Sequence, residues 1–251
     1  MIVNSPKRDD IPSLKALFAE AFGDEGGFID TFFDTAFSEN RARVIYKEGK
    51  ISAMLYWFDC EYLGKPLAYI YAVATDKAYR GQGLCSILMQ DTHKHLKSLG
   101  YSGAILVPSE PSLFNFYERL GYKTATFIGE LSRESSTQGC HFTSIDKNEY
   151  ARLRKEYLPK NAIIQEKENL DFLEKLATFI KGEDFLLSYS IYENKLHAYE
   201  FLGNTEKAPS ILSTLGVDSG TFRGVGKARP FTMLCPFENL TPPEYFAFAF
   251  D

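Results

Sequence analysis

The stretch LAYIYAVATDKAYRGQGLCSILM, residues 67–89, decides the fold of this chain. Its first part is dense in β-branched and aromatic residues, which is typical of a buried strand. The turn Arg80–Gly83 follows. After the turn, leucine and isoleucine recur at helical spacing as far as Gly100, which is well placed to end a helix. The sequence therefore predicts a strand, a glycine-rich turn and a helix.

The turn before this helix has the features of a phosphate-binding loop. The first backbone N–H groups of a helix have no partner within it and carry the positive end of its dipole. Gly81 and Gly83 let an anion approach these groups closely, and Arg80 adds positive charge. No lysine followed by Ser or Thr closes the turn, which excludes a P-loop, and Ser86 replaces the third glycine of a dinucleotide-binding fingerprint.

The turn resembles motif A of the GCN5-related N-acetyltransferases (GNAT), where Q/R-x-x-G-x-G/A lies between a strand and a helix. Arg80 to Cys85 fill this pattern, and Cys85 stands where the family prefers Gly or Ala. Cysteine is small and often behaves as a hydrophobic residue, so a close approach of the helix is still compatible with it. A second segment, FYERLGY at residues 116–122, is similar to the family's F-Y-x-x-x-G-F/Y. Two motifs in the right order are far more specific than either alone.

The order of the predicted elements indicates an α+β fold. Helices start near Asp10 and Phe28, and three antiparallel strands then lead to Thr75. After the turn come a helix, a strand, a second helix and a last strand that ends near Glu130. The resemblance implies the three-layer α/β GNAT fold with a mixed, mainly antiparallel central sheet, and we assign residues 1–132 to this acetyltransferase domain.

The second half is predicted to be a smaller, degenerate GNAT-like domain, residues 140–251, after a polar linker at residues 132–139. Its expected elements are a helix at 169–180, a hairpin at 185–202, a helix at 208–215 and strands at 231–235 and 245–250. This order repeats that of the first half in shortened form and resembles tandem N-acetyltransferases. Residues 223–228 also spell R-x-x-G-x-A, but no helix follows, so we expect a loop without a cofactor. We expect this half to shape or cover the acceptor cleft.

The composition is that of a globular protein, with 251 residues, 45% hydrophobic and 24% charged. A net charge of −5 argues against a nucleic-acid partner and suits a cationic acceptor. No apolar run has the length of a signal peptide core or a membrane span, and the 4 cysteines are scattered. We therefore expect a cytoplasmic protein with free thiols, no membrane partner and no metal site. The sequence does not indicate an oligomeric state.

The GNAT resemblance implies acetyl-CoA, or a near relative, as co-substrate. It assigns the donor-binding residues, which are Val73, Ala74, Thr75, Arg80, Gly81, Gln82, Gly83, Leu84, Cys85, Val107 and Phe114. Backbone groups at the strand end would hold the pantetheine arm and polarise the thioester carbonyl, and the turn would bind the pyrophosphate. Strands that splay near Thr75 and Val107 would admit the arm. Tyr117 would protonate the departing thiolate, although a tyrosine in this pattern can equally be a packing residue.

The acceptor and the general base are left open by the sequence. A small-molecule amine, an aminoglycoside-like polyamine, an amino acid or a peptide or protein N-terminus would fit as acceptor, and positioning would supply much of the acceleration. Candidate bases are Asp59, Glu61, Tyr69, Tyr71, Glu110, the carboxylate of Asp251 and water. We favour an active N-acetyltransferase. The alternatives are a silent acyl-CoA-binding sensor or interaction protein, and an enzyme of the same fold that takes its acyl group from aminoacyl-tRNA.

Overall fold

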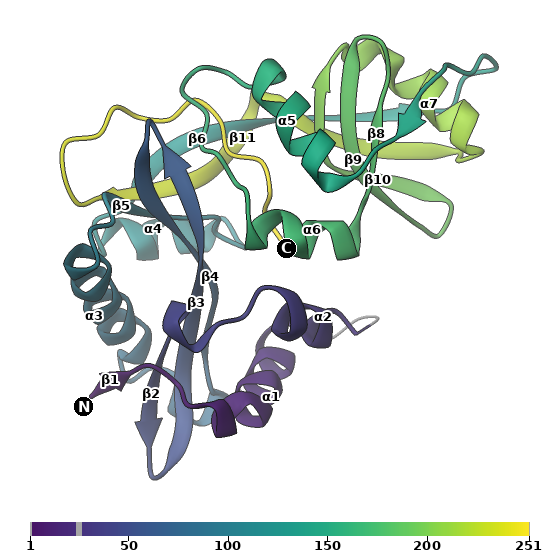
Figure 1. Ribbon diagram of the computed structural model, residues 1–251. Coiled ribbons are helices and arrows are strands. Elements are labelled where there is room, and N and C mark those ends of the chain that lie inside the picture. Colours follow the sequence, from purple (N-terminus) through teal and green to yellow (C-terminus); the bar gives the residue numbers. More distant parts are fainter. Residues whose placement is uncertain (1, 24–26, 251) are drawn as a thin grey trace. The chain divides into compact units, whose positions relative to one another are not determined.

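The computed structural model describes residues 2–23 and 27–250 (Figure 1). Two compact units are present, and each is made of segments that are separated in the sequence. Unit 1 comprises Met1–Lys123, Lys167–Phe172 and Met233–Thr241, and unit 2 comprises Thr124–Glu166, Leu173–Thr232 and Pro242–Asp251. These units are defined by which residues pack together, not by sequence order. The assignment of residues 1–132 and 140–251 to two family domains stays a prediction.

Unit 1 contains a mixed sheet. Its strands, in spatial order, are β1 (Val3–Asn4), β2 (Ala42–Lys47), β3 (Lys50–Tyr62), β4 (Lys65–Thr75), β5 (Gly103–Leu106) and the last residues of β11 (Ser219–Pro236). The β4–β5 pair is parallel, and the other described pairs of this unit are antiparallel. The predicted α+β class with a mixed, mainly antiparallel sheet is confirmed.

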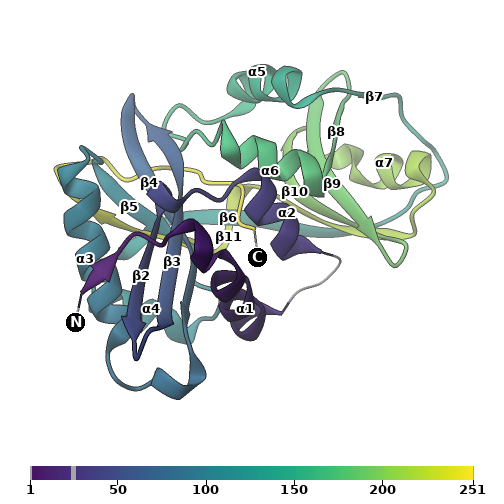
Figure 2. The ribbon, with the colours of Figure 1, turned by 60° about the horizontal axis from the view of Figure 1, so that its bottom comes forward.

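Helices cover both faces of this sheet (Figures 1 and 2). They are α1 (Ile11–Phe22), α2 (Phe28–Thr35), α3 (Leu84–Ser98) and α4 (Ser112–Glu118). Successive side chains of a strand point to opposite faces. Leu55 and Trp57 of β3 accordingly join the core that includes α3 and α4. Tyr56 and Phe58 point the other way, and their ring centroids lie 5.0 and 6.1 Å from that of Phe32 on α2.

A bulge interrupts the register of β4 with β3 shortly before the end of β4. Ala72 and Val73 together lie opposite Leu55 of β3, and Ala72 has a left-handed φ of 51°. Among the described strands, pairing of β4 with β5 ends at Tyr69 and Ile105. The rest of β4 therefore has no strand partner on its β5 side. The sheet is open next to the glycine-rich turn.

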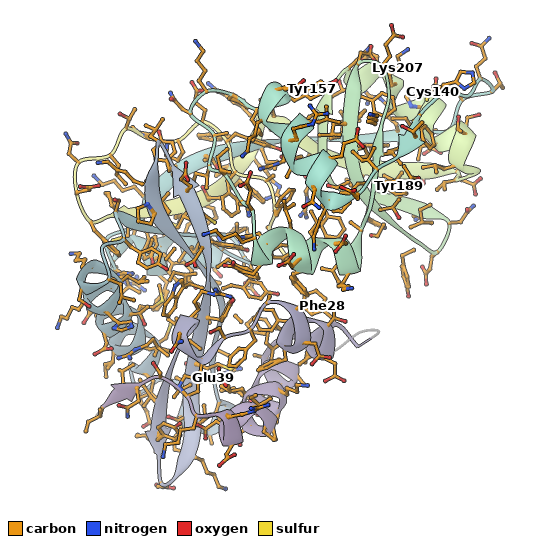
Figure 3. All side chains as sticks on the ribbon, in the orientation of Figure 1. Phe28, Glu39, Cys140, Tyr157, Tyr189 and Lys207 are labelled. Carbon is orange, nitrogen blue, oxygen red and sulfur yellow. The ribbon has the colours of Figure 1, made fainter. Side chains whose placement is uncertain are left out.

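The segment Lys167–Phe172, which follows much of unit 2 in the sequence, completes unit 1. Glu168 accepts a hydrogen bond from the backbone N–H of Asp59 on β3, with an N–O distance of 2.7 Å. The Phe172 ring packs 5.2 Å from that of Phe28, which is labelled in Figure 3. Burial of aromatic rings is a main source of folding free energy, so this segment is part of the core of unit 1.

Unit 2 contains the remaining strands of the same sheet, which continues through β11. Its strands are β6 (Lys123–Glu134), β7 (Thr143–Ser144), β8 (Thr178–Lys181), β9 (Phe185–Tyr192), β10 (Lys195–Gly203) and most of β11, in the spatial order β11-β10-β9-β8-β7 with β6 beside β11. Its helices are α5 (Lys147–Tyr157), the end of α6 (Glu168–Leu176) and α7 (Ala208–Leu215). The predicted hairpin and the predicted helix at 208–215 are confirmed. The helix predicted at 169–180 ends earlier, because β8 starts at Thr178.

The loop predicted at residues 223–228 is wrong, because these residues lie inside β11. The glycines there serve close backbone packing. A Cβ on Gly224 would lie 2.4 Å from the carbonyl oxygen of Phe201, and one on Gly226 would lie 2.6 Å from the Cα of Gly129. Strand packing therefore accounts for the second R-x-x-G-x-A match.

The strand predicted at Tyr245–Phe250 is also wrong, since only an isolated bridge forms there. Gln165 holds this segment in place of a ladder. Its side chain accepts two backbone N–H bonds from the segment and donates to the carbonyl oxygen of Phe248 at 2.9 Å. The Arg154 guanidinium lies 4.5 Å from the Phe248 ring centroid and binds the buried Glu200 carboxylate through two hydrogen bonds, 2.6 and 3.0 Å long.

Candidate active site

The glycine-rich turn links the unpaired end of β4 to α3. Arg80 donates a hydrogen bond from Nε to the carbonyl oxygen of Thr75 at 3.0 Å. Gly81 and Gly83 have φ values of 75° and 74°, which L side chains rarely adopt. A Cβ at either position would meet no atom within 4 Å. The backbone conformation therefore requires the glycines, and the space over the turn is open.

The first turn of α3 offers backbone N–H groups. Leu84 is the first helical residue, and the N–H of Ile87 makes a bond to the carbonyl oxygen of Gly83, 3.1 Å long. The N–H groups of the three residues before Ile87 lie in the turn where a helix has no internal acceptor for them. With Arg80 beside them, they form a site suited to an anion.

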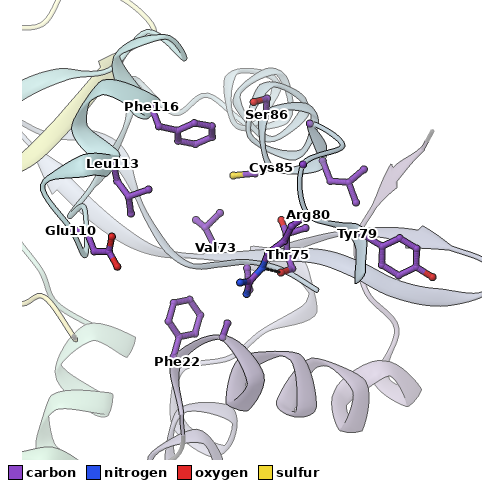
Figure 4. Close-up of a pocket in the computed structure, with 15 residues that line it drawn as sticks. Phe22, Val73, Thr75, Tyr79, Arg80, Cys85, Ser86, Glu110, Leu113 and Phe116 are labelled. Atoms are coloured by element: carbon purple, nitrogen blue, oxygen red, sulfur yellow. Dashed lines mark hydrogen bonds between the residues drawn. The ribbon is translucent and has the colours of Figure 1, made fainter. Parts of the chain in front are cut away.

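A cavity of about 540 Å³ opens at this turn (Figure 4). Such a volume lies in the range of ligand sites, about 300–1,000 Å³. Its wall comes from the end of α1, the end of β4, the turn, the first turn of α3, and α4 with the loop before it. The residues that line it are Ala21, Phe22, Val73, Ala74, Thr75, Tyr79, Arg80, Gly81, Gly83, Leu84, Cys85, Ser86, Glu110, Leu113 and Phe116.

The fold brings eight of the twelve sequence-predicted site residues to this cavity. They are Val73, Ala74, Thr75, Arg80, Gly81, Gly83, Leu84 and Cys85. Gln82, Val107, Phe114 and Tyr117 are not among the lining residues. The Gln82 side chain instead accepts a hydrogen bond from the Lys47 ammonium. Phe114 packs against the core under α3 and α4.

Several lining residues have no signal in the sequence motifs. Leu113 and Phe116 are three residues apart on α4, a spacing that places them on one helix face. Phe22 is half exposed at the end of α1 and reaches the cavity only because α1 packs against β4. Glu110 precedes α4 and contributes the carboxylate of the wall, although the sequence named it only as one of several possible bases.

Tyr117 on α4 is buried, with 8% of its surface exposed. Its ring centroid lies 5.2 Å from that of Phe116 and 5.8 Å from that of Tyr122. Burial, and to a lesser extent the Cys85 thiol, raises the pKa of Tyr117 well above its ordinary value, so the hydroxyl keeps its proton at neutral pH. No described group hydrogen-bonds this hydroxyl, and its oxygen is not one of the fully buried polar atoms that lack a partner, so it keeps some access to solvent.

Cys85 faces the same cavity from the first turn of α3 (Figure 4). Burial raises the pKa of its thiol to about 11. At neutral pH the thiol is therefore protonated, and a protonated thiol is a poor nucleophile. Its surroundings favour a packing role within the cavity wall over covalent chemistry.

Asp59 is already engaged within unit 1. It accepts a hydrogen bond from the Tyr101 hydroxyl at 2.5 Å, and its second carboxylate oxygen lies 3.7 Å from the Arg41 guanidinium. A carboxylate held in this way is less available as a base than one that faces a cavity.

The remaining candidate bases are scattered. Glu61 is exposed and does not line the cavity. The rings of Tyr69 and Tyr71 pack with Phe58 on the sheet face covered by α1 and α2. Asp251 lies outside the described residues. Glu110 is the candidate that the fold brings to the cavity.

Within the part of the chain that the structure describes, no group of three or more His, Cys, Asp or Glu side chains is arranged to hold a metal ion. No described helix is both long enough and apolar enough to cross a bilayer.

Solved structures with the same fold come from several organisms. The GCN5-related N-acetyltransferase from Anabaena variabilis has 16% identity and a TM-score of 0.70, with 93% of this chain and 72% of that chain covered. The GCN5-related N-acetyltransferase from Kribbella flavida has 15% identity and a TM-score of 0.69, with 93% and 71% covered. At these identities the likeness shows a shared fold. None of the curated proteins compared with the chain matches it.

The sequence itself matches one family model. The match is to the acetyltransferase (GNAT) domain and spans residues 3–125. These residues include the glycine-rich turn, the cavity wall and Tyr117. The chain thus carries, over residues 3–125, a domain of the GNAT acetyltransferase family.

Proposed function

We propose that this protein is an N-acetyltransferase that moves an acetyl group from acetyl-CoA to a primary amine by direct attack in a ternary complex. One observation carries the proposal. A single cavity joins the anion-binding start of α3 to the end of β4, where the backbone has no strand partner on its β5 side. A thioester substrate with a diphosphate needs both features side by side.

The diphosphate of the donor is matched to the turn. The N–H groups at the start of α3 and the Arg80 guanidinium supply donors and positive charge, and the left-handed glycines keep the space above them free. The pantetheine arm would run along Val73 to Thr75 and hydrogen-bond backbone groups on the side that has no strand partner, as a further strand would. A backbone N–H there would polarise the thioester carbonyl.

Tyr117 is proposed as the general acid. The amine nitrogen forms a bond to the carbonyl carbon, the carbon–sulfur bond breaks, and its electron pair stays on sulfur. Tyr117 gives its proton to that sulfur and becomes a tyrosinate. The proton that the attacking nitrogen loses then returns to the tyrosinate oxygen. The protonated hydroxyl supports this role, because no described residue hydrogen-bonds it and its oxygen is not fully enclosed, which leaves it able to bond a ligand.

Calorimetric titration with acetyl-CoA and with CoA tests the donor site. We expect micromolar binding that is lost in Gly83→Glu, because the new carboxylate would lie beside the diphosphate. Gly100→Glu is the matched control: Gly100 also has a left-handed φ with open space, but it follows the opposite end of α3. Undiminished binding by Gly83→Glu would remove the turn from the donor site. No binding by the wild-type protein would refute the proposed function.

A turnover assay distinguishes an active acetyltransferase from a silent acyl-CoA-binding protein. Release of free CoA thiol in the presence of an amine would support acyl transfer. Tight CoA binding with no thiol release from any amine tested would favour a silent acyl-CoA-binding sensor.

We further propose that residues 140–251 are a degenerate copy of the GNAT fold. The β9–β10 hairpin followed by α7 repeats, in shortened form, the β3–β4 hairpin followed by α3. Gly203–Lys207, which lies where the first half has its glycine-rich turn, has neither the arginine nor the paired glycines, so we expect no second donor site.

A further inference from the structure

The donor cavity has charges of both signs in its wall. Arg80 is the only cationic side chain among its described lining residues, and Glu110 is the only anionic one. The other side chains of the wall are apolar or neutral. A donor with a diphosphate is drawn to the Arg80 side and repelled by Glu110, so the carboxylate is unsuited to the donor and calls for another explanation.

Glu110 is held at the start of α4. Its carbonyl oxygen accepts the N–H of Leu113 at 3.1 Å, and its carboxylate accepts the Ser112 hydroxyl at 3.1 Å. No described Lys, Arg or His lies within 4.0 Å of this carboxylate. The carboxylate is thus exposed at the cavity and bonded by a neutral donor, with no cation among the described residues as its partner.

An aromatic ring borders the same part of the cavity. In Figure 4, Glu110, Leu113 and Phe22 all appear on the side away from Cys85 and Ser86 at the start of α3. Phe22 is 50% exposed and packs on its inner side against Phe18, with ring centroids 5.1 Å apart. An aromatic face attracts a cation, as a carboxylate does, so both side chains of this wall favour an ammonium group in the cavity.

We propose that Glu110 is a specificity-determining residue that binds an ammonium group of the acceptor, with Phe22 as the neighbouring wall, and so selects cationic amines. The inference rests on the proposed acetyl transfer and names its acceptor class: aliphatic amines with a positive charge beyond the nitrogen that reacts. Acceptors with a carboxylate in that place are disfavoured by repulsion from Glu110.

Three probes of matched length test this selection: 1,5-diaminopentane, pentylamine and 5-aminopentanoate. Each is titrated by calorimetry into the protein, both with CoA bound and without it, and each is assayed for thiol release from acetyl-CoA. We expect the diamine to bind most tightly and react with the highest kcat/KM, and the amino acid to rank last. Loss of one charge-assisted contact in Glu110→Gln should weaken diamine binding about tenfold.

Two further variants make the result specific. Glu118→Gln is the matched control, because Glu118 is an exposed carboxylate at the other end of α4 and does not line the cavity. It should leave the ranking of the three probes unchanged. Glu110→Lys should reverse the ranking and favour 5-aminopentanoate.

Equal kcat/KM for the diamine and pentylamine, or an unchanged ranking of affinities in both Glu110 variants, would overturn the inference. Absence of CoA binding in the wild-type protein would instead refute the proposed function. Because the amine titrations are also made without CoA, they would still decide whether Glu110 binds ammonium groups. Weak diamine binding that does not respond to Glu110→Gln would place the amine elsewhere and contradict the inference.

Discussion

Tyr117→Phe removes one hydroxyl and leaves the ring in place, so it separates a chemical role from a packing role. The ring keeps its contacts with Phe116 and Tyr122. Because no described group hydrogen-bonds the hydroxyl, its loss breaks no bond of the folded protein, and the free energy of unfolding should change by less than about 0.5 kcal/mol. Affinity for CoA should stay nearly the same.

The expected effect of Tyr117→Phe is on turnover. Loss of a positioned general acid lowers a rate by about 10²-fold or more, which corresponds to about 2.7 kcal/mol of transition-state stabilisation. The fall should appear in kcat, because the proton is needed only as the carbon–sulfur bond breaks.

Tyr122→Phe is the matched control. The Tyr122 ring is buried beside that of Tyr117, but its hydroxyl is 2.8 Å from Nε2 of the buried His93. Removing it leaves His93 unpaired and should destabilise the protein by about 1–2 kcal/mol, with little effect on kcat. That loss corresponds to a fall in Tm of several degrees, about 2–4 °C per kcal/mol for a chain of this size.

The assay is thiol release at saturating acetyl-CoA with a responsive amine, together with thermal melts and CoA calorimetry on the same preparations. Tyr117→Phe with an unchanged kcat would return Tyr117 to a packing role. A Tm drop equal to that of Tyr122→Phe would show that the Tyr117 hydroxyl has a structural partner, contrary to its geometry.

The other predictions concern stability. Burial lowers the pKa of His93 from 6.5 to about 4, so between these values the unfolded chain binds a proton that the folded chain does not. The free energy of unfolding should therefore fall by about 3 kcal/mol as pH falls from 7 to 4. In His93→Gln, this part of the pH dependence of the urea midpoint should disappear. Arg154→Met leaves the buried Glu200 carboxylate unpaired and should destabilise the protein by about 3–5 kcal/mol, whereas Arg154→Met with Glu200→Leu should recover most of it; a double variant as unstable as the single one would contradict this. A chain cut at Gly139 lacks the later segments that complete unit 1 and should aggregate; a monomeric, cooperatively melting fragment would refute this.

Local pattern predicted most elements of the fold, because periodicity and turn residues act over short stretches. The β9–β10 hairpin and α7 lie where the sequence places them. Two of the predicted elements are wrong for reasons that lie in the tertiary structure. Residues 223–228 have the glycines of a loop, yet they form a strand because other backbones pack closely against them. The aromatic run at 245–250 has the pattern of a strand, yet Gln165 and Arg154 satisfy it without a ladder.

The site divides in a similar way. Sequence motifs identified the part of the cavity that belongs to one continuous stretch, from Val73 to Cys85. They missed Phe22 and ranked Glu110 as one base among several, because nothing near these residues in the chain marks them as neighbours of the turn. Gln82 fits the motif, but its side chain turns to Lys47.

From the sequence alone one could predict a strand, a glycine-rich turn and a helix start that together suit an anion, since these properties follow from local backbone conformation and the helix dipole. The sequence also determined the GNAT identity of the first half, because two motifs in fixed order are encoded locally. Only the tertiary structure shows what surrounds that unit: a sheet edge that is open among the described strands, a tyrosine hydroxyl that no described residue bonds, and a carboxylate and an exposed ring in one cavity wall. These features depend on which distant segments pack together. That packing follows from burial of the whole hydrophobic core, and it cannot be predicted from any short stretch of sequence.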